Sequence, residues 1–166
     1  MASKLEIIDK IVIRTQEPAI RIISKVGKLA NAADRDHCIQ YMVAVGLIFG
    51  DLIAENYEDN FHQENQLIDR LRDKMIIEED KKFSIDYLDP EKRSIANAVQ
   101  VFFNDGSCSD DIQIEYPIGH KKRREEGIPL LEEKFWNNLN TCFDKDKSKL
   151  IYDLCLLYTS PSPRDG

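Results

Sequence analysis

The clearest pattern near the N-terminus is an alternation of apolar and polar residues. Within residues 7–15, Ile11 and Ile13 fall on one face and Arg14 on the other. A period of two residues is the signature of a half-buried β-strand. A shorter apolar run at residues 75–78 predicts a second strand.

A turn sequence between two further alternating runs predicts a β-hairpin. Residues 104–107 (Asn-Asp-Gly-Ser) separate residues 98–103 from residues 111–116, and these residue types tolerate the positive φ angles of tight turns. In the second run Ile112 and Ile114 share one face. We therefore expect a sheet with one buried face and one solvated face.

Helical spacing appears between these strands. A short helix is predicted from near Pro18, a residue tolerated in a first turn, to near Gly27. A second helix has Asp34 as its N-cap and Gly50 as its terminating residue. Because residues 38–49 are apolar on almost every side, this helix is expected to be buried.

Two more helices are predicted further along the chain. The second half of residues 54–73 has apolar residues at helical spacing, and a final amphipathic helix begins near Pro129. Its apolar stripe consists of Leu131, Phe135 and Leu139. Residues 84–90 are predicted to form a loop, and residues 119–127 a charged connector.

The resulting order of elements, β-α-α-α-β-β-β-α, predicts an α+β fold. In such a fold an antiparallel sheet has helices packed on one face. The length of 166 residues and the apolar content of 42% are sufficient for one core.

Composition excludes several classes of function. The formal net charge of -7 argues against nucleic acid as a partner, because such binding needs a basic face. The longest apolar run, residues 41–49, is about half of a membrane span, and no secretory pattern opens the chain. The four cysteines are scattered, which favours reduced intracellular thiols over disulfides or a zinc site.

The last residues differ from the rest. From Cys155 to Asp165 the helical pattern stops and two Ser-Pro pairs follow. A natural disordered C-terminus is one interpretation. The run also matches, at all eleven positions, the translation of a transposon sequencing adapter. We therefore expect residues 155–166 to be a non-native tail and the native sequence to be cut near Leu154.

Two clusters could bind an anion. Arg35 and His37 lie near a predicted helix N-terminus, where free N–H groups and positive side chains favour carboxylates, although simple helix capping is the more common reason for such residues. His120 begins a basic run, and both a binding role and a solvated connector remain open. His62 and Glu64 lack the cysteines of a zinc site, so no metal is expected.

Five stretches taken together resemble the MmgE/PrpD family. The similarity extends over residues 5–145, and its most specific runs are DRDHCIQYMVAV, DPEKRSIAN and EYPIGH. The resemblance implies an α+β lid domain at residues 1–118. Residues 119–154 would be a connector and a return helix of a separate all-helical domain.

The same resemblance implies a reaction. The branch with these runs is a lyase that removes water from 2-methylcitrate, a tricarboxylate, to give 2-methyl-cis-aconitate in propionate breakdown by the methylcitrate cycle. It implies no cofactor, a homodimer, and a location in the bacterial cytoplasm or the mitochondrial matrix. The expected substrate contacts are Arg21, Arg35, His37 and His120.

The family's main acid–base residues are expected to lie outside these 166 residues, so the chain alone is expected to be an inactive fragment. Two alternatives stay open. One is a stand-alone module with the lid fold that binds a polycarboxylate or a protein. The other is a sister activity of the family, a decarboxylase or an epimerase.

Overall fold

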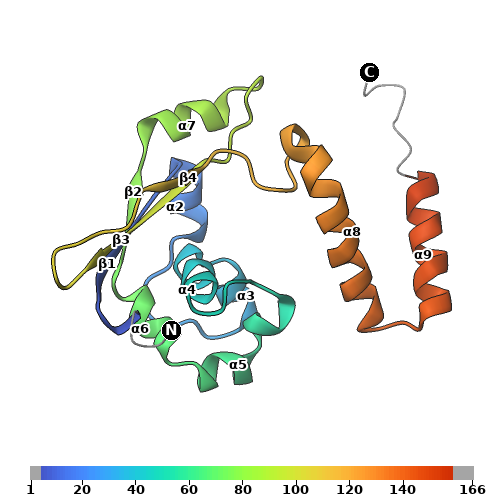
Figure 1. Cartoon of the computed structure of the whole chain (residues 1–166), viewed down its shortest axis with the longest axis horizontal. Helices are drawn as coiled ribbons and strands as arrows, with labels where there is room; N and C mark the ends of the chain where they lie inside the picture. The colour runs from blue at the N-terminus through green and yellow to red at the C-terminus, as the bar shows by residue number, and fades with distance from the viewer. Residues whose placement is uncertain (1–4, 159–166) are drawn as a thin grey trace. The chain divides into compact units, whose positions relative to one another are not determined.

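The chain divides into two compact units in a computed structural model that describes residues 5–158 (Figure 1). The first unit is Met1–Glu115 and the second is Tyr116–Gly166. The first contains the four strands found among the described residues and is an α+β structure, as the order of elements predicted. The second is helical.

The sheet has the strand order β2-β1-β3-β4, from β1 (Ile8–Thr15), β2 (Met75–Glu79), β3 (Asn97–Phe103) and β4 (Ile112–Ile114). β1 pairs antiparallel with β3, and β3 with β4. β2 pairs parallel with β1, so the sheet is mixed, and the expectation of an entirely antiparallel sheet was wrong at this strand. The long helical connection between β1 and β2 allows the parallel return.

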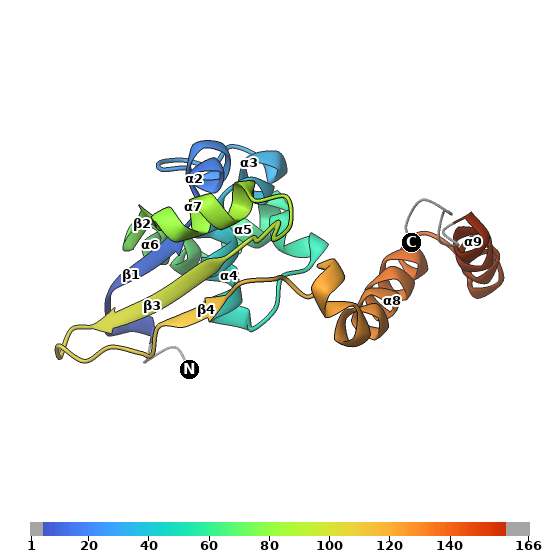
Figure 2. The same cartoon turned by 90° about the horizontal axis from the view of Figure 1, so that it is seen from above.

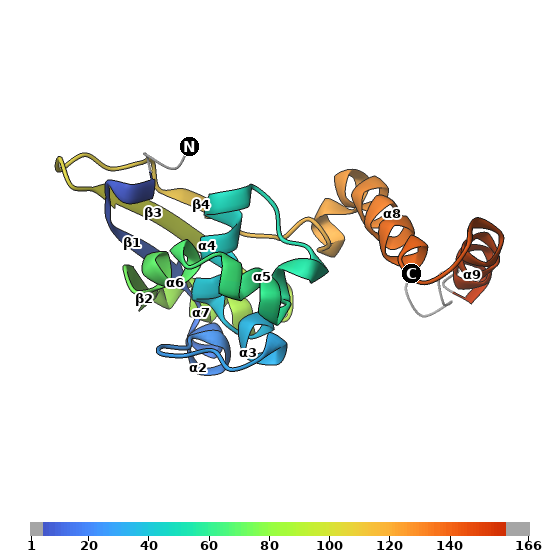
Figure 3. The same ribbon diagram turned by 90° about the horizontal axis from the view of Figure 1, so that it is seen from below.

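One face of the sheet forms the main core. Ile11 and Ile13 on β1 are almost completely buried, and Val99 lies opposite Ile13 on β3. Helices α4 (Ile39–Phe49) and α6 (Leu67–Arg72) contribute to the same core cluster and contact each other. Figure 3 shows α3 to α6 gathered on this side of the strands.

The predicted buried helix is divided into two helices. α3 (Ala32–Asp36) begins at Asn31, whose side chain accepts a hydrogen bond from Asp34 N, so Asn31 and not Asp34 is the N-cap. α4 then starts at Ile39 and ends at Gly50, which has a φ of 82° and is the left-handed terminator that was predicted. Phe49 is exposed, since α5 and α6 cover only part of this apolar helix.

The other helices of the first unit are short. α2 (Glu17–Ile23) follows β1 and ends four residues before the predicted limit at Gly27. η1 (Ala54–Tyr57) and α5 (Asp59–Glu64) precede α6.

Residues 84–90 were predicted to form a loop, but most of them belong to helix α7 (Lys81–Leu88). The Asp80 side chain caps this helix by accepting hydrogen bonds from Lys82 N at 2.9 Å and Phe83 N at 3.3 Å. Phe83 packs with Ala96 and Ala98 in a second, smaller core cluster. This cluster is separate from the main core, and in Figure 1 α7 lies on the other side of the strands from α4 and α6.

The β3–β4 hairpin has the predicted turn, with Gly106 at a φ of 85°, and Figure 2 shows its loop projecting from one end of the sheet. Ile112 pairs with Val99, so the register places it on the face of the main core. Ile112 and Ile114 nevertheless remain 58% and 51% exposed. The expectation that both are buried was wrong, because the helical layer of this unit does not extend over β4.

The second unit is a pair of helices. η2 (Lys121–Arg123) leads directly into α8 (Arg124–Asn140), which starts five residues before Pro129 and contains it. The acidic residues Glu125 and Glu126 lie in its first turn, where the helix dipole favours negative charge. α8 contacts α9 (Lys145–Tyr158).

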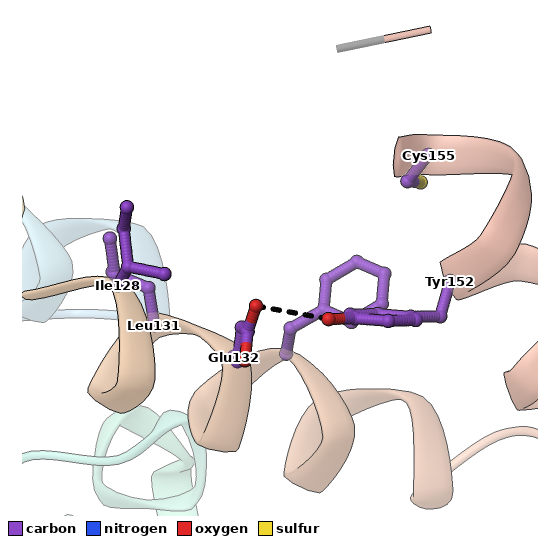
Figure 4. A pocket seen from close by; sticks show the side chains of 6 residues that line it. Ile128, Leu131, Glu132, Tyr152 and Cys155 are labelled. Atoms are coloured by element: carbon purple, nitrogen blue, oxygen red, sulfur yellow. Dashed lines mark hydrogen bonds between the residues drawn. The ribbon is translucent and has the colours of Figure 1, made fainter. Parts of the chain in front are cut away.

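Aromatic rings join the two helices. The rings of Trp136 and Tyr152 have centroids 4.7 Å apart, and Tyr152 donates a 3.0 Å hydrogen bond to Glu132 (Figure 4). This hydrogen bond to a carboxylate is the main cause that raises the pKa of Tyr152. An open apolar groove of about 200 Å³ lies beside them, lined also by Ile128 and Leu131.

α9 continues to Tyr158, so the helix does not end at Leu154 as the sequence pattern suggested. Residues 159–166, the remainder of the expected non-native tail, lie outside the described residues. No helix within residues 5–158 is both long enough and apolar enough to cross a membrane.

Candidate functional site

Arg21 is the more accessible of the two arginines that were predicted to contact substrate. It lies in the last turn of α2, and its side chain is 69% exposed. Its Nε atom is 3.7 Å from the Glu17 carboxylate one turn earlier. An exposed ion pair at this distance contributes little to stability, so Arg21 remains available to contact an anion.

Arg35 has a different position. Its side chain is only 2% exposed, its Nε donates a 2.7 Å hydrogen bond to the Tyr57 carbonyl, and its guanidinium forms an ion pair with Asp59. Tyr41 supports the same turn by donating a 2.6 Å hydrogen bond to the Asn56 carbonyl, and burial raises the pKa of Tyr41 to about 12. Arg35 therefore holds η1 and the start of α5 and is not exposed to a ligand.

His37 is the C-cap residue of α3, and it directly precedes Cys38, the N-cap residue of α4. Its ring is 59% exposed, and Nδ1 lies 3.2 Å from the Asp36 carboxylate. Asp34 accepts hydrogen bonds from Ala30 N and Lys25 Nζ, which hold its pKa below the ordinary value. His37 therefore lies beside the N-terminus of α4, and not within the single long helix that was predicted, and its ring is accessible.

His120 belongs to the second unit. Its Nδ1 accepts a 3.2 Å hydrogen bond from Lys122 N, and its ring packs on Tyr116 with centroids 4.6 Å apart. Lys122 Nζ donates a 2.8 Å hydrogen bond to the Tyr116 hydroxyl. We refer to these three residues as the Tyr116–His120–Lys122 cluster.

The four predicted residues are not gathered by direct contacts. Within residues 5–158 no hydrogen bond or ion pair joins any two of Arg21, Arg35, His37 and His120. Sequence reasoning treated Lys122 as a solvated residue of the connector and gave Tyr116 no role beyond the hairpin. Tyr116 and His120 lie in the family-like run at residues 115–120, but Lys122 lies outside it, and the sequence pattern did not predict their contact.

A second polar cluster, which the sequence analysis did not identify, lies where β1 ends. Thr15 is fully buried, and its Oγ1 lies 2.7 Å from both Gln16 Oε1 and Asn97 Oδ1. Ser84 Oγ accepts a 2.9 Å hydrogen bond from Glu17 N nearby. Asn97 ends the family-like run DPEKRSIAN, which is the sequence signal that could have drawn attention to this cluster.

α7 carries a third polar cluster. The nearly buried Asp86 carboxylate accepts hydrogen bonds from Lys82 at 2.8 Å and Lys92 at 2.5 Å. These hydrogen bonds lower the pKa of Asp86 and raise the pKa of both lysines. Both ammonium groups are thus engaged with an internal carboxylate, so the cluster stabilises the segment after α7 and is a weak candidate for ligand binding.

Metal-assisted chemistry has no candidate centre in the described part of the chain, where no three His, Cys, Asp or Glu side chains lie close enough to hold an ion. The described groups can instead donate hydrogen bonds to anions. Arg21, His37 and the Tyr116–His120–Lys122 cluster present cationic or N–H and O–H donors on accessible surfaces. Such donor sets suit carboxylates, which only accept hydrogen bonds when ionised.

Comparison with protein families identifies the class. The model of the MmgE/PrpD C-terminal domain matches residues 1–157, and the chain therefore belongs to the MmgE/PrpD family. The resemblance found in the sequence is confirmed.

Within this family, the chain is most informatively compared with three curated relatives. The chain is 53% identical over 149 residues to the 2-methylcitrate dehydratase of Salmonella typhimurium, an alignment that covers 90% of this chain and 31% of that protein. It is 51% identical to the mitochondrial 2-methylcitrate dehydratase of Yarrowia lipolytica, over 87% of this chain and 28% of that one. Identity to alkylcitrate dehydratase phiI of a fungal species is 42%, over 90% and 30%. The chain thus spans about a third of these relatives.

Proposed function

We propose that this chain is the C-terminal part of a hydro-lyase that converts 2-methylcitrate into 2-methyl-cis-aconitate and water. The observation that carries the proposal is the 53% identity over 90% of the chain to a protein named 2-methylcitrate dehydratase. Identity to the alkylcitrate dehydratase is lower, at 42%, which favours the methyl-substituted substrate over longer alkyl chains.

The described residues support a substrate-binding role and not the complete reaction. Dehydration needs a base that removes a proton beside a carboxylate and an acid that protonates the leaving hydroxide. The exposed Arg21 and His37 and the Tyr116–His120–Lys122 cluster can hold carboxylates. We propose that the main acid and base lie in the part of the relatives that this chain does not span.

The resemblance to the family also suggests a pathway, an assembly and a compartment. We propose a role in propionate breakdown through the methylcitrate cycle, and a homodimer as the active assembly. The compartment would be the bacterial cytoplasm or the mitochondrial matrix, and the name of the Yarrowia lipolytica relative includes the word mitochondrial.

A chimeric enzyme tests the proposal. In it, this chain replaces the matching C-terminal region of the Salmonella typhimurium relative, and formation of the conjugated double bond is followed by ultraviolet absorbance. We expect the chimera to dehydrate 2-methylcitrate faster than a longer alkylcitrate, and the 166-residue chain alone to have no activity. A chimera that folds like its parent but leaves 2-methylcitrate unchanged would contradict the proposal.

A further inference from the structure

At the start of the second unit, His120 and Lys122 both lie against the ring of Tyr116. Together with the Tyr116 hydroxyl, they provide three hydrogen-bond donors. We propose that the Tyr116–His120–Lys122 cluster binds one carboxylate group of the tricarboxylate substrate, which adds Tyr116 and Lys122 to the residues that select it. This inference rests on the proposed function. It commits to a carboxylate because the groups left for a ligand, the Tyr116 O–H, the His120 Nε2–H and the Lys122 ammonium, all donate hydrogen bonds, whereas an ionised carboxylate only accepts them.

The Lys122–Tyr116 contact sets the direction of the phenol. Lys122 Nζ donates to the Tyr116 hydroxyl oxygen at 2.8 Å and lies 4.5 Å from the centroid of the same ring. An ammonium group has no lone pair, so it cannot accept from the phenol. The Tyr116 O–H must therefore point away from Lys122, where it can donate to a ligand.

The histidine is oriented in the same way. His120 Nδ1 accepts the hydrogen bond of Lys122 N at 3.2 Å, so in the neutral ring Nδ1 carries the lone pair and Nε2 carries the proton. The ring also packs on Tyr116 at 4.6 Å. Nε2–H is then a second donor held beside the phenol, and the Lys122 ammonium adds a third donor and the positive charge.

The backbone under the cluster is firmly held. Arg123 Nη1 donates a 2.8 Å hydrogen bond to the Tyr116 carbonyl, and Arg123 also forms an ion pair with Glu126. Gly127 is buried against the Ile118 carbonyl so closely that a β-carbon would overlap it. A preformed donor set loses less conformational entropy when a ligand binds, whereas a solvated connector would need none of these contacts.

A binding experiment on the 166-residue chain tests the cluster directly. The labelled chain is titrated with 2-methylcitrate, and the side-chain NMR signals of Tyr116 and His120 are followed. The variants Tyr116→Phe and Lys122→Met each remove one donor, and we expect each to raise the Kd about tenfold, the usual effect of losing one charge-assisted hydrogen bond. Lys121→Met is the matched control for charge, and its Kd should stay within about twofold of the wild-type value.

His120→Asn separates binding from structure. Asparagine can still accept the Lys122 N–H as an N-cap residue, but it lacks the imidazole Nε2–H. If His120 acts only as an N-cap, binding should be unchanged, whereas our proposal predicts about a tenfold weaker complex. Saturable shifts lost in these variants would support the proposal. Signals that do not move, or a His120→Asn variant that binds like wild type, would overturn it.

The chimera distinguishes this inference from the proposed function. If the chimera is active and Tyr116→Phe, His120→Asn and Lys122→Met leave its KM unchanged, the cluster does not select the substrate, although the dehydratase proposal stands. If the chimera is inactive while the three variants weaken binding of 2-methylcitrate to the chain, the dehydratase proposal fails and the carboxylate site stands.

Discussion

The two units of the chain differ in how much they bury. Every buried hydrophobic residue of the described core, from Ile8 to Ala98, lies in the first unit. In the second unit the buried residues of the described range are Gly127 and Ser148, and Leu131 is 45% exposed. A sheet with a helical layer encloses side chains between two surfaces, whereas two paired helices leave their outer faces open.

This difference indicates which interactions stabilise each unit. The first unit depends on burial of apolar surface, which is the dominant favourable contribution to folding. The second depends on short-range contacts, such as the rings of Trp136 and Tyr152 and the packing of Gly127 on Ile118. Its open apolar face is the kind of surface that other protein segments cover.

The largest effect is expected from a matched pair of substitutions that shorten one apolar side chain in each unit. Ile11→Ala, in the buried face of the sheet, should lower the free energy of unfolding by about 2–5 kcal/mol. Leu131→Ala, on the half-open face of α8, should lower it by about 1 kcal/mol or less, because much of that side chain is already in water. Urea unfolding followed by far-UV circular dichroism measures both, and equal losses would remove the contrast between the units.

Gly127→Ala tests the tightest contact of the second unit. The added methyl group would overlap the Ile118 carbonyl, so we expect a loss of about 1–3 kcal/mol, typical of overpacking. The fluorescence of Trp136, the single tryptophan of the chain, reports on this unit during unfolding. Gly46→Ala, at a helical glycine with open space around it, is the control and should cause no loss of stability. If Gly127→Ala also caused no loss, the contact with Ile118 would relax freely.

Acid should affect the first unit through Asp86. Hydrogen bonds from Lys82 and Lys92 hold its pKa below the ordinary 3.8, so its contribution to stability is present above that value and is lost as the pH falls through the folded-state pKa. Asp86→Asn should therefore flatten the decline of Tm between about pH 5 and pH 2. At neutral pH its effect should be modest, because the freed side chains of Lys82 and Lys92 are 72% and 45% exposed to water.

The matched substitution in the second unit is Asp153→Asn. Its ion pair with Lys149 is exposed on both sides, and such pairs contribute little to stability. We expect the acid profile of Tm to match that of wild type. If Asp86→Asn and Asp153→Asn gave the same profile, the buried position of Asp86 would have no consequence.

The smallest effects are expected at the glycines of α4. Gly50 has a φ of 82°, and Gly50→Ala should cost about 1 kcal/mol, because a β-carbon is strained in the left-handed region. Gly46→Ala should instead stabilise the helix by up to about 1 kcal/mol, since alanine is the better helix former. Thermal unfolding of the two variants should shift Tm in opposite directions, and shifts of the same sign would be contrary to this explanation.

Much of the first unit could be predicted because its strands follow local periodicity. β1 and β3 begin and end within one residue of the predicted runs. α7 could not be predicted in this way, since only Phe83 of its apolar residues is buried while Ile85 and Leu88 remain exposed. The feature that could have predicted α7 is the capping residue Asp80, and not the hydrophobic pattern.

The candidate site was less predictable than the fold. The sequence pattern identified His120 as a candidate. Its partners Tyr116 and Lys122 became apparent only in the structure, where the turn before α8 places the three side chains in contact. Arg35 shows the opposite case. The sequence suggested an anion contact, and the structure buries its guanidinium against Tyr57 and Asp59.

By itself, the sequence determined the α+β class, the main strands, the hairpin turn and the family, because backbone periodicity, turn residues and long shared runs are properties of neighbouring positions. Only the tertiary structure decided that β2 runs parallel to β1, that Ile112 is left uncovered and that Arg35 faces inward. The path of the chain brings distant residues together, and the burial of a charge or the direction of a strand depends on those partners.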